Sequence, residues 1–149
     1  MTHSPTADLA DSTGKPSVLF VCVKNGGKSQ MAAALARRFG GDAVEVHSAG
    51  TEPGSKLNAE SESAVRELGA TFEGERPKPI DPELFKRADR IVVIGTEADV
   101  QPVDGMRGTI EVWDTVEPSR DGIEGEERMR LVRDDIADRV KALLAELGA

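Results

Sequence analysis

The sequence predicts an α/β fold around a four-stranded parallel sheet. Four short runs, at residues 17–22, 43–50, 90–95 and 109–114, are apolar or alternate between apolar and polar residues, as strands do. Segments with helical periodicity separate the first three runs, and strands that alternate with helices pair in parallel through right-handed crossovers. The 149 residues, 38% hydrophobic and 31% charged, suffice for one domain with a sizeable core.

The N-terminal segment, residues 1–16, is rich in Ser, Thr, Asp and Pro and offers little to bury, so we expect a mobile tail. It lacks a basic start followed by an apolar stretch, which argues against a signal peptide. No apolar run approaches the ~18 residues of a membrane span. A single cysteine cannot form an internal disulfide. We therefore expect one cytoplasmic domain over residues 17–149, and no membrane partner.

The first half of the domain is predicted to run strand, helix, strand, helix. Residues 17–22 are continuously apolar, as in a parallel strand that is buried on both faces. Helical spacing follows over residues 28–40. Residues 43–50 alternate as a second strand, and residues 56–70 form an amphipathic helix that Gly69 stops.

The second half begins with a proline-rich loop. A short helix is expected directly after Asp81, because Pro82 suits the first helical position. Two further strands follow at residues 90–95 and 109–114, and a long helix covers about residues 126–147. The apolar stripe of this helix contains Met129, Val132, Ile136, Val140, Leu143 and Leu147.

The functional site is expected at the carboxyl ends of the strands. In open α/β sheets, ligands bind beyond these ends. Cys22, Gly50, Gly95 and Asp114 each fall at or directly after the end of a predicted strand. Because parallel strands end at one edge of the sheet, these residues define a shared edge.

The segment after Cys22 has the composition of an oxyanion-binding loop. Its Gly and Asn residues can turn successive backbone N–H groups inward, with the positive N-terminus of a helix behind them. The same field favours the thiolate form of Cys22, which then becomes a nucleophile. Lys28 adds a positive charge at the rim, and Ser29 can donate to the sulfur or cap the helix. The predicted cradle consists of Val23, Lys24, Asn25, Gly26, Gly27 and Lys28.

A structural cysteine beside a glycine-rich turn is the alternative interpretation. The loop matches neither GxGxxG nor GxxxxGK[ST], so glycine content alone is a weak signal. The combination of Asn25, two glycines, Lys28 and Ser29 in register with Cys22 favours the catalytic interpretation.

These residues resemble the strand–loop–helix signature of the low-molecular-weight protein tyrosine phosphatases and of the arsenate reductases that share their fold. That signature is Cys-x5-Arg-Ser/Thr with Asn three residues after Cys. Residues 47–51, 88–99 and 111–118 resemble further segments of the family in the same order. The resemblance implies a three-layer sandwich with Cys22 as nucleophile.

The chain departs from the family pattern at two positions. Lys28 stands where the loop has Arg, and a lysine supplies a point charge instead of a planar fork. Glu117 stands before Pro118 where the family usually has Asp. The resemblance therefore implies Glu117 as the general acid, with Asp114 as the second choice.

Four features favour an arsenate reductase over a tyrosine phosphatase. No aromatic residue follows Pro118, and the chain contains no Tyr. Gln30 follows Ser29, and Trp113 ends the fourth strand, as in the reductases that the sequence resembles. The loop also lacks the arginine on which phosphoryl transfer depends. A phosphatase and a non-catalytic oxyanion-binding protein remain the alternatives.

The single cysteine implies an external source of sulfur. The thioredoxin-linked reductases of this fold carry two more cysteines in the segment that matches residues 95–102, and this chain has none there. The resemblance points to the actinobacterial solution, in which mycothiol is a co-substrate that joins arsenate and the glutaredoxin-like mycoredoxin releases arsenite. Glutathione or bacillithiol could fill the same role. No bound cofactor is expected.

Other classes of ligand are not indicated. The net charge of −8 argues against a nucleic-acid partner, which needs a basic surface. No His, Cys or Asp cluster has the spacing of metal ligands, so we expect no metal. Trp113 is expected to pack in the core or at its rim and His47 to lie on the surface. A solvated helix face is expected for Glu60, Glu62 and Glu67.

Overall fold

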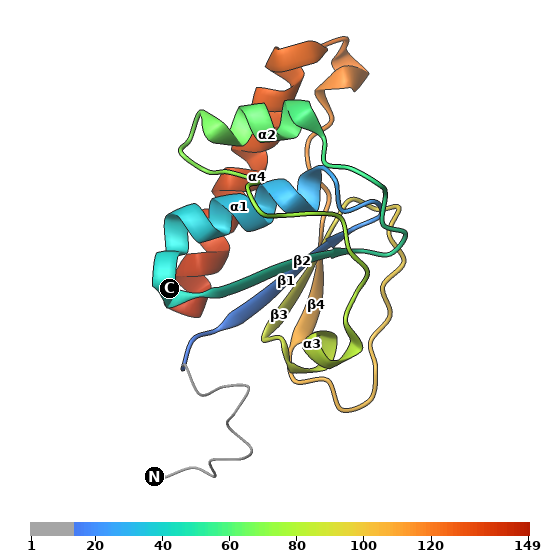
Figure 1. Ribbon diagram of the computed structural model, residues 1–149, viewed down its shortest axis with the longest axis vertical. Coiled ribbons are helices and arrows are strands. Elements are labelled where there is room, and N and C mark those ends of the chain that lie inside the picture. The colour runs from blue at the N-terminus through green and yellow to red at the C-terminus, as the bar shows by residue number, and fades with distance from the viewer. Residues whose placement is uncertain (1–13) are drawn as a thin grey trace.

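The structure, a computed structural model, describes residues 14–149, so most of the tail expected at residues 1–16 lies outside the described residues. Its centre is a four-stranded sheet with the order β2-β1-β3-β4 (Figure 1). All three neighbouring pairs are parallel, which confirms the predicted pairing. The strands are β1 (Ser17–Cys22), β2 (Glu45–Gly50), β3 (Arg90–Ile94) and β4 (Thr109–Trp113).

Helices cover both faces of the sheet, so the molecule has three layers (Figure 1). One face packs Val18, Phe20 and Val92 against helices α1 (Lys28–Gly40), α2 (Ala59–Arg66) and α4 (Gly125–Leu147). The other face packs Leu19, Val21 and Ile91 against α3 (Pro82–Arg87). The predicted three-layer α/β sandwich is confirmed. Among residues 14–149, no helix combines the length and the apolar character that crossing a membrane requires.

The central strand β1 is buried on both faces, as its continuous apolar run predicts. The side chains from Val18 to Val21 are fully buried. Phe20 meets the Trp113 ring with a centroid distance of 5.9 Å. Trp113 is itself buried and donates from Nε1 to Glu111 Oε2 at 2.8 Å, so its expected packing role is confirmed. This rigid strand fixes the position of the residue that follows Val21, which is Cys22.

The second strand and the second helix differ most from their expected ranges, and β3 and β4 each end one residue earlier than expected. A short 3-10 helix, η1 (Gly41–Ala43), precedes β2, so the second strand begins at Glu45 instead of residue 43. Helix α2 covers Ala59–Arg66 instead of residues 56–70. Asn58 caps it by accepting from the Ser61 amide at 2.8 Å, while the Asn58 amide itself donates to Gly26 O at 2.7 Å. Residues 56–58 are therefore not helical, and Asn58 is hydrogen-bonded to the loop that follows Cys22.

The apolar stripe of α4 is confirmed, and Glu67 is exposed as expected, although it also pairs with two arginines of α4. Arg133 is buried in this helix and donates to Ala64 O at 3.0 Å and to Glu67 Oε1 at 2.7 Å. Arg130 adds two hydrogen bonds to the same carboxylate. The bonds from Arg130, followed by those from Arg133, lower the pKa of Glu67 to about 2. Glu67 thus lies on an exposed face and also links the end of α2 to α4.

Glu60, Glu62 and His47 lie at or near the surface, where the sequence predicts them. Glu60 is exposed, and Glu62 is half-buried and pairs with Arg66 at 3.0 Å. The His47 ring is half-buried, and its Nε2 lies 2.6 Å from Glu45 Oε2. His47 therefore belongs to an ion-pair group at the start of β2, away from the carboxyl edge.

Candidate active site

The loop between β1 and α1 lies at the carboxyl edge of the sheet, as predicted. In the β1–β2 register, Cys22 stands opposite Gly50. The carbonyl oxygens of Cys22, Val23 and Lys24 accept from the amides of residues 51, 52 and 54 at 2.8–3.0 Å. The loop backbone is therefore fixed from outside by the segment that follows β2.

Two glycines permit this close packing. A Cβ atom at Gly50 would lie 2.7 Å from Val23 O, and one at Gly26 would lie 2.8 Å from Lys56 O. Either side chain would push backbone against backbone. Glycine occupies both positions because the backbone of a neighbouring segment lies where a side chain would begin.

The loop also presents amides that have no partner. Within residues 14–149, the backbone N–H groups of Lys24, Gly26 and Gly27 make no hydrogen bond. Gly27 precedes α1, whose N-terminus carries partial positive charge. The structure thus brings the predicted cradle residues together around the start of a helix, which is an arrangement that binds tetrahedral oxyanions.

The Cys22 sulfur receives two hydrogen bonds. The Asn25 amide donates to Cys22 Sγ at 3.2 Å, and Ser29 Oγ lies 2.9 Å from the same sulfur. Ser29 Oγ also accepts from Asn25 Nδ2 at 2.8 Å, which leaves the hydroxyl hydrogen for the sulfur. Both donors are aimed at this sulfur, which lies beside the N-terminus of α1. The half-buried Cys22 is thus equipped as a nucleophile.

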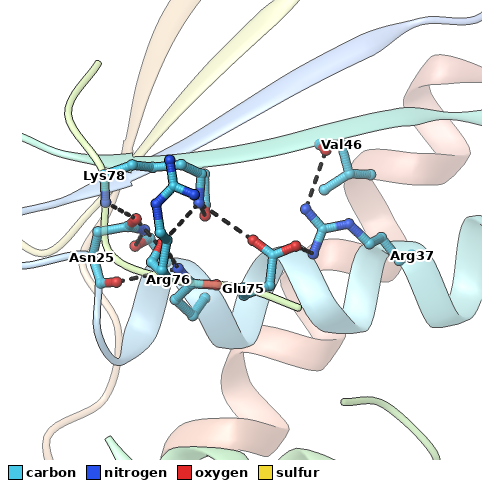
Figure 2. Close-up of polar contacts among 9 residues, drawn as sticks. Asn25, Arg37, Val46, Glu75, Arg76 and Lys78 are labelled. Carbon is cyan, nitrogen blue, oxygen red and sulfur yellow. Dashed lines mark hydrogen bonds and ion pairs between the residues drawn. The ribbon is translucent and has the colours of Figure 1, made fainter. Parts of the chain in front are cut away.

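Asn25 fixes the geometry of the loop from within. It is fully buried and holds a left-handed backbone, with φ of 55°. Its Oδ1 accepts from Gln30 Nε2 at 3.2 Å and from the Lys78 amide at 3.1 Å. Figure 2 shows Asn25 beside Lys78. These two donors orient the side-chain amide so that Nδ2 points to Ser29. Asn25, predicted only as a cradle residue, therefore also orients Ser29 toward the sulfur.

The segment of residues 75–79 packs against the loop, and Figure 2 shows Arg76 and Lys78 beside Asn25. Arg76 O accepts from Gln30 Nε2 at 3.2 Å, and Lys78 O accepts from the Gly50 amide at 2.8 Å. Lys78 Nζ lies within 3.3 Å of Ser48 Oγ and Glu75 Oε1. Sequence reasoning described this segment only as a proline-containing loop, because its contacts to Asn25 and Gln30 bridge about fifty positions.

Asn25→Ala is expected to lower turnover at this site by about 10²-fold and stability by about 1–3 kcal/mol. Alanine disfavours the left-handed backbone and cannot orient Ser29, so the sulfur loses its aligned donors. The measurement is kcat together with the free energy of unfolding in urea.

Asp81→Ala is the matched control for that experiment. Asp81 caps α3 by accepting from the Glu83 amide at 3.0 Å, far from Cys22 in the chain. Its loss should cost about 1 kcal/mol of stability and leave turnover unchanged. Equal turnover in Asn25→Ala and the natural protein would contradict the role of Asn25.

Glu117 lies at the mouth of the loop, but as a paired carboxylate. Its Oε1 is 3.9 Å from Lys28 Nζ, and Arg128 donates to both carboxylate oxygens at 2.8 and 3.1 Å. Ser119 Oγ donates to Oε2 at 2.6 Å. The hydrogen bonds from Arg128, then that from Ser119, lower the pKa of Glu117 to about 2. Glu117 is therefore ionised at neutral pH in this arrangement.

The acid role predicted for Glu117 consequently requires a change in its surroundings. A carboxylate held by Arg128 carries no proton to donate, so Arg128 must first release it. Asp114, the second choice, is exposed, and its backbone oxygen accepts from Arg139 at 3.0 Å. The structure thus places Glu117, and not Asp114, beside Lys28. The acid assignment stays a prediction.

A cleft of about 360 Å³ opens beside the loop, between it and helices α2 and α4. Its apolar floor includes Met31 and Met129. Four cationic side chains line it: Lys24, Lys28, Lys56 and Arg128. Sequence reasoning missed Lys56 and Arg128, because nothing local connects them to the loop. Within residues 14–149, no group of His, Cys, Asp and Glu could hold a metal ion.

The sequence matches known proteins over nearly its full length. The profile of the family described as low molecular weight phosphotyrosine protein phosphatase matches residues 17–149. An arsenate reductase from Halalkalibacterium halodurans is 33% identical over 138 residues, which cover 90% of this chain and 98% of the relative. The glutaredoxin arsenate reductase of Synechocystis sp. is 30% identical over 134 residues, which cover 88% of this chain and 98% of the relative.

Solved structures share the same architecture. A thioredoxin-dependent arsenate reductase from Corynebacterium glutamicum has a TM-score of 0.74 at 28% identity; the match covers 90% of this chain but only 62% of that longer chain. An arsenate reductase in the phosphate binding state has a TM-score of 0.76 at 27% identity, covering 89% of this chain and 98% of the other. A tyrosine phosphatase from Erwinia amylovora, 14% identical with a TM-score of 0.72 over 91% of this chain and 95% of its own, shares the fold.

Proposed function

Because the chain belongs to the low molecular weight phosphotyrosine protein phosphatase family, we propose that it reduces arsenate to arsenite with Cys22 as the nucleophile. The observation that carries the proposal is the Cys22 sulfur, which receives donors from Asn25 and Ser29 inside a loop of unpartnered amides. The arsenate reductases among the relatives support arsenate as the oxyanion.

The first step forms a sulfur–arsenic bond. The Cys22 thiolate attacks arsenic, and one arsenate oxygen leaves as water after it takes up protons. The amides of Lys24, Gly26 and Gly27 and the Lys28 ammonium stabilise the remaining oxygens, while Ser29 donates to the sulfur when it leaves again. A general acid, for which Glu117 is the first candidate, protonates the departing oxygen.

The second sulfur comes from outside the chain, because Cys22 is the only cysteine. A small thiolate attacks arsenic, displaces the Cys22 thiolate and carries arsenic away as a thiol adduct. A redoxin thiolate then attacks the sulfur of this adduct, the electron pair of the sulfur–arsenic bond passes to arsenic, and arsenite leaves. A second small thiol regenerates the redoxin, so two thiols become one disulfide per arsenite. Following the resemblance, we propose that the small thiol is mycothiol and the redoxin is mycoredoxin, and that the reaction takes place in the cytoplasm.

A phosphatase is the second candidate, because the same cradle would bind a phosphoryl group. Two features of the site disfavour it. Lys28 offers a point charge instead of a bidentate fork. The 3-10 helix η2 (Pro118–Asp121), which follows Glu117, contains no aromatic residue that could hold a phenol ring.

An assay of arsenate and of a chromogenic phosphomonoester, each with and without small thiol, tests the proposal. Arsenite that forms only with a thiol supports it. Hydrolysis of the phosphomonoester at comparable rates without thiol would select the phosphatase. Binding of phosphate without either activity would select a non-catalytic oxyanion-binding protein.

Lys28→Arg is expected to raise phosphomonoester hydrolysis by about 10- to 100-fold. A guanidinium grips two oxygens of the phosphoryl group, and placed charge contributes most of the rate in such reactions. The measurement is kcat/KM for a chromogenic phosphomonoester. Lys24→Arg, in the same loop, is the control and should show no gain. If Lys28→Arg binds phosphate but hydrolyses no faster, the limit lies in Glu117 or in the missing aromatics.

A further inference from the structure

We propose that Arg128 binds the oxyanion substrate at the mouth of the Cys22 loop and supplies the guanidinium that the loop itself lacks. Arg128 belongs to the first turn of α4, remote in sequence from the loop. The inference depends on the proposed function only in naming arsenate as the oxyanion; anion binding itself does not depend on turnover.

Arg128 and Lys28 already share one anionic partner. Glu117 Oε1 lies 3.1 Å from Arg128 Nη2 and 3.9 Å from Lys28 Nζ. Both cations also line the cleft that Gly26 and Gly27 border. The Arg128 guanidinium, which comes from α4, and the Lys28 ammonium of the loop therefore contact the same carboxylate oxygen of Glu117.

The Glu117 carboxylate fills the guanidinium fork as an oxyanion would. Arg128 Nε and Nη2 donate to its two oxygens, which is the bidentate geometry that arginine also offers to tetrahedral oxyanions. Glu117 thus occupies in the resting protein the donors that a substrate needs. Arsenate, which carries more charge, can displace it and take over both cations.

The charges around the cleft favour such an exchange. The chain carries a net charge of −8, yet four cations line this one cleft. Lys24 and Lys56 form no ion pair with another side chain within residues 14–149. The carboxylates that act on Arg128 besides Glu117 are Glu124 and Glu60. A doubly charged oxyanion that enters this cleft meets two lysines without an ion-pair partner as well as the guanidinium of the Arg128–Glu117 pair.

The exchange would also change Glu117. The hydrogen bonds from Arg128 are the main cause of the lowered pKa of Glu117, so this pKa rises when Arg128 turns to the oxyanion, although Ser119 still lowers it. Substrate binding and the preparation of a general acid are then one event. This resolves the difficulty that Glu117 carries no proton in the resting pair.

Inorganic phosphate, which does not react, is the probe for the test. Its dissociation constant, measured by calorimetry, should rise at least tenfold in Arg128→Gln and less in Arg128→Lys, which keeps the charge but not the fork. Arg130→Gln is the control, because Arg130 lies on the same helix but pairs with Glu67 and Glu126. It should bind phosphate as the natural protein does.

A double variant separates direct binding from simple neutralisation of Glu117. Glu117→Gln alone should bind phosphate more tightly, since it frees Arg128. The double variant Arg128→Gln, Glu117→Gln should bind at least tenfold more weakly than Glu117→Gln. Equal affinities of these two variants would overturn the proposal, because Arg128 would then act only by cancelling Glu117.

Kinetics and rescue complete the test. Arg128→Gln should raise KM for arsenate more than it lowers kcat, and adding Lys28→Arg should restore phosphate affinity at least in part. An unchanged phosphate affinity in Arg128→Gln would refute the inference even if arsenate is reduced. If Arg128→Gln binds phosphate more weakly but the natural protein does not reduce arsenate, the proposed function is refuted and the inference about Arg128 still holds.

Discussion

Cys22→Ser is expected to abolish arsenate turnover, by at least about 10⁴-fold, and to leave the fold intact. The hydroxyl of serine is a far weaker nucleophile than a thiolate and cannot hold arsenic as a sulfur adduct. Serine is smaller than cysteine and can keep a hydrogen bond to Ser29, so the loop keeps its shape. The measurement is arsenite release under saturating arsenate and small thiol.

Phosphate binding by Cys22→Ser is the control for that experiment. The amides of Lys24, Gly26 and Gly27 remain in the variant, so its affinity for phosphate should stay within a few-fold of the natural value. Turnover above about 1% of the natural rate, with the fold and phosphate binding unchanged, would show that Cys22 is not the nucleophile.

Withholding the small thiol is expected to remove turnover just as completely. Cys22 is the only cysteine, so an internal disulfide cannot form and the arsenic adduct cannot be resolved within the chain. Methionine sulfur does not replace a thiolate in this step. Without thiol, the enzyme should release less than one arsenite per molecule. Mycothiol, glutathione and bacillithiol are then added one at a time to find which of them restores repeated turnover.

The thiol that sustains turnover should show saturation kinetics, because it must enter the loop to reach arsenic. Several arsenite molecules released per enzyme in the absence of any small thiol would contradict the single-cysteine mechanism.

The sequence alone was sufficient to predict the sheet, the order of the elements and the place of Cys22. The reason is physical: β1 is buried on both faces and therefore continuously apolar, and a parallel sheet collects its strand ends at one edge. The loop could be assigned because Asn, Gly, Lys and Ser act there through local geometry.

The contacts that complete the site could not be predicted. The sequence predicts a helix from residue 56, but the helix begins at Ala59, and the Asn58 amide donates to the Gly26 carbonyl instead. Lys78 reaches Asn25 across 53 positions, and Arg128 reaches Glu117 from a different element. Such contacts depend on tertiary packing, which leaves no periodic trace in the sequence. The state of Glu117 followed from one of them and could not be inferred from its place before Pro118.

The central claim is that an external small thiol, and not a protein disulfide relay, completes the reaction. A reconstituted assay tests it most directly: enzyme, arsenate, thioredoxin, thioredoxin reductase and NADPH, with no small thiol present. We expect no sustained NADPH consumption and no arsenite beyond one per enzyme, and we expect both to recover when mycothiol and mycoredoxin are added. Steady NADPH consumption coupled to arsenite release with thioredoxin alone would contradict it.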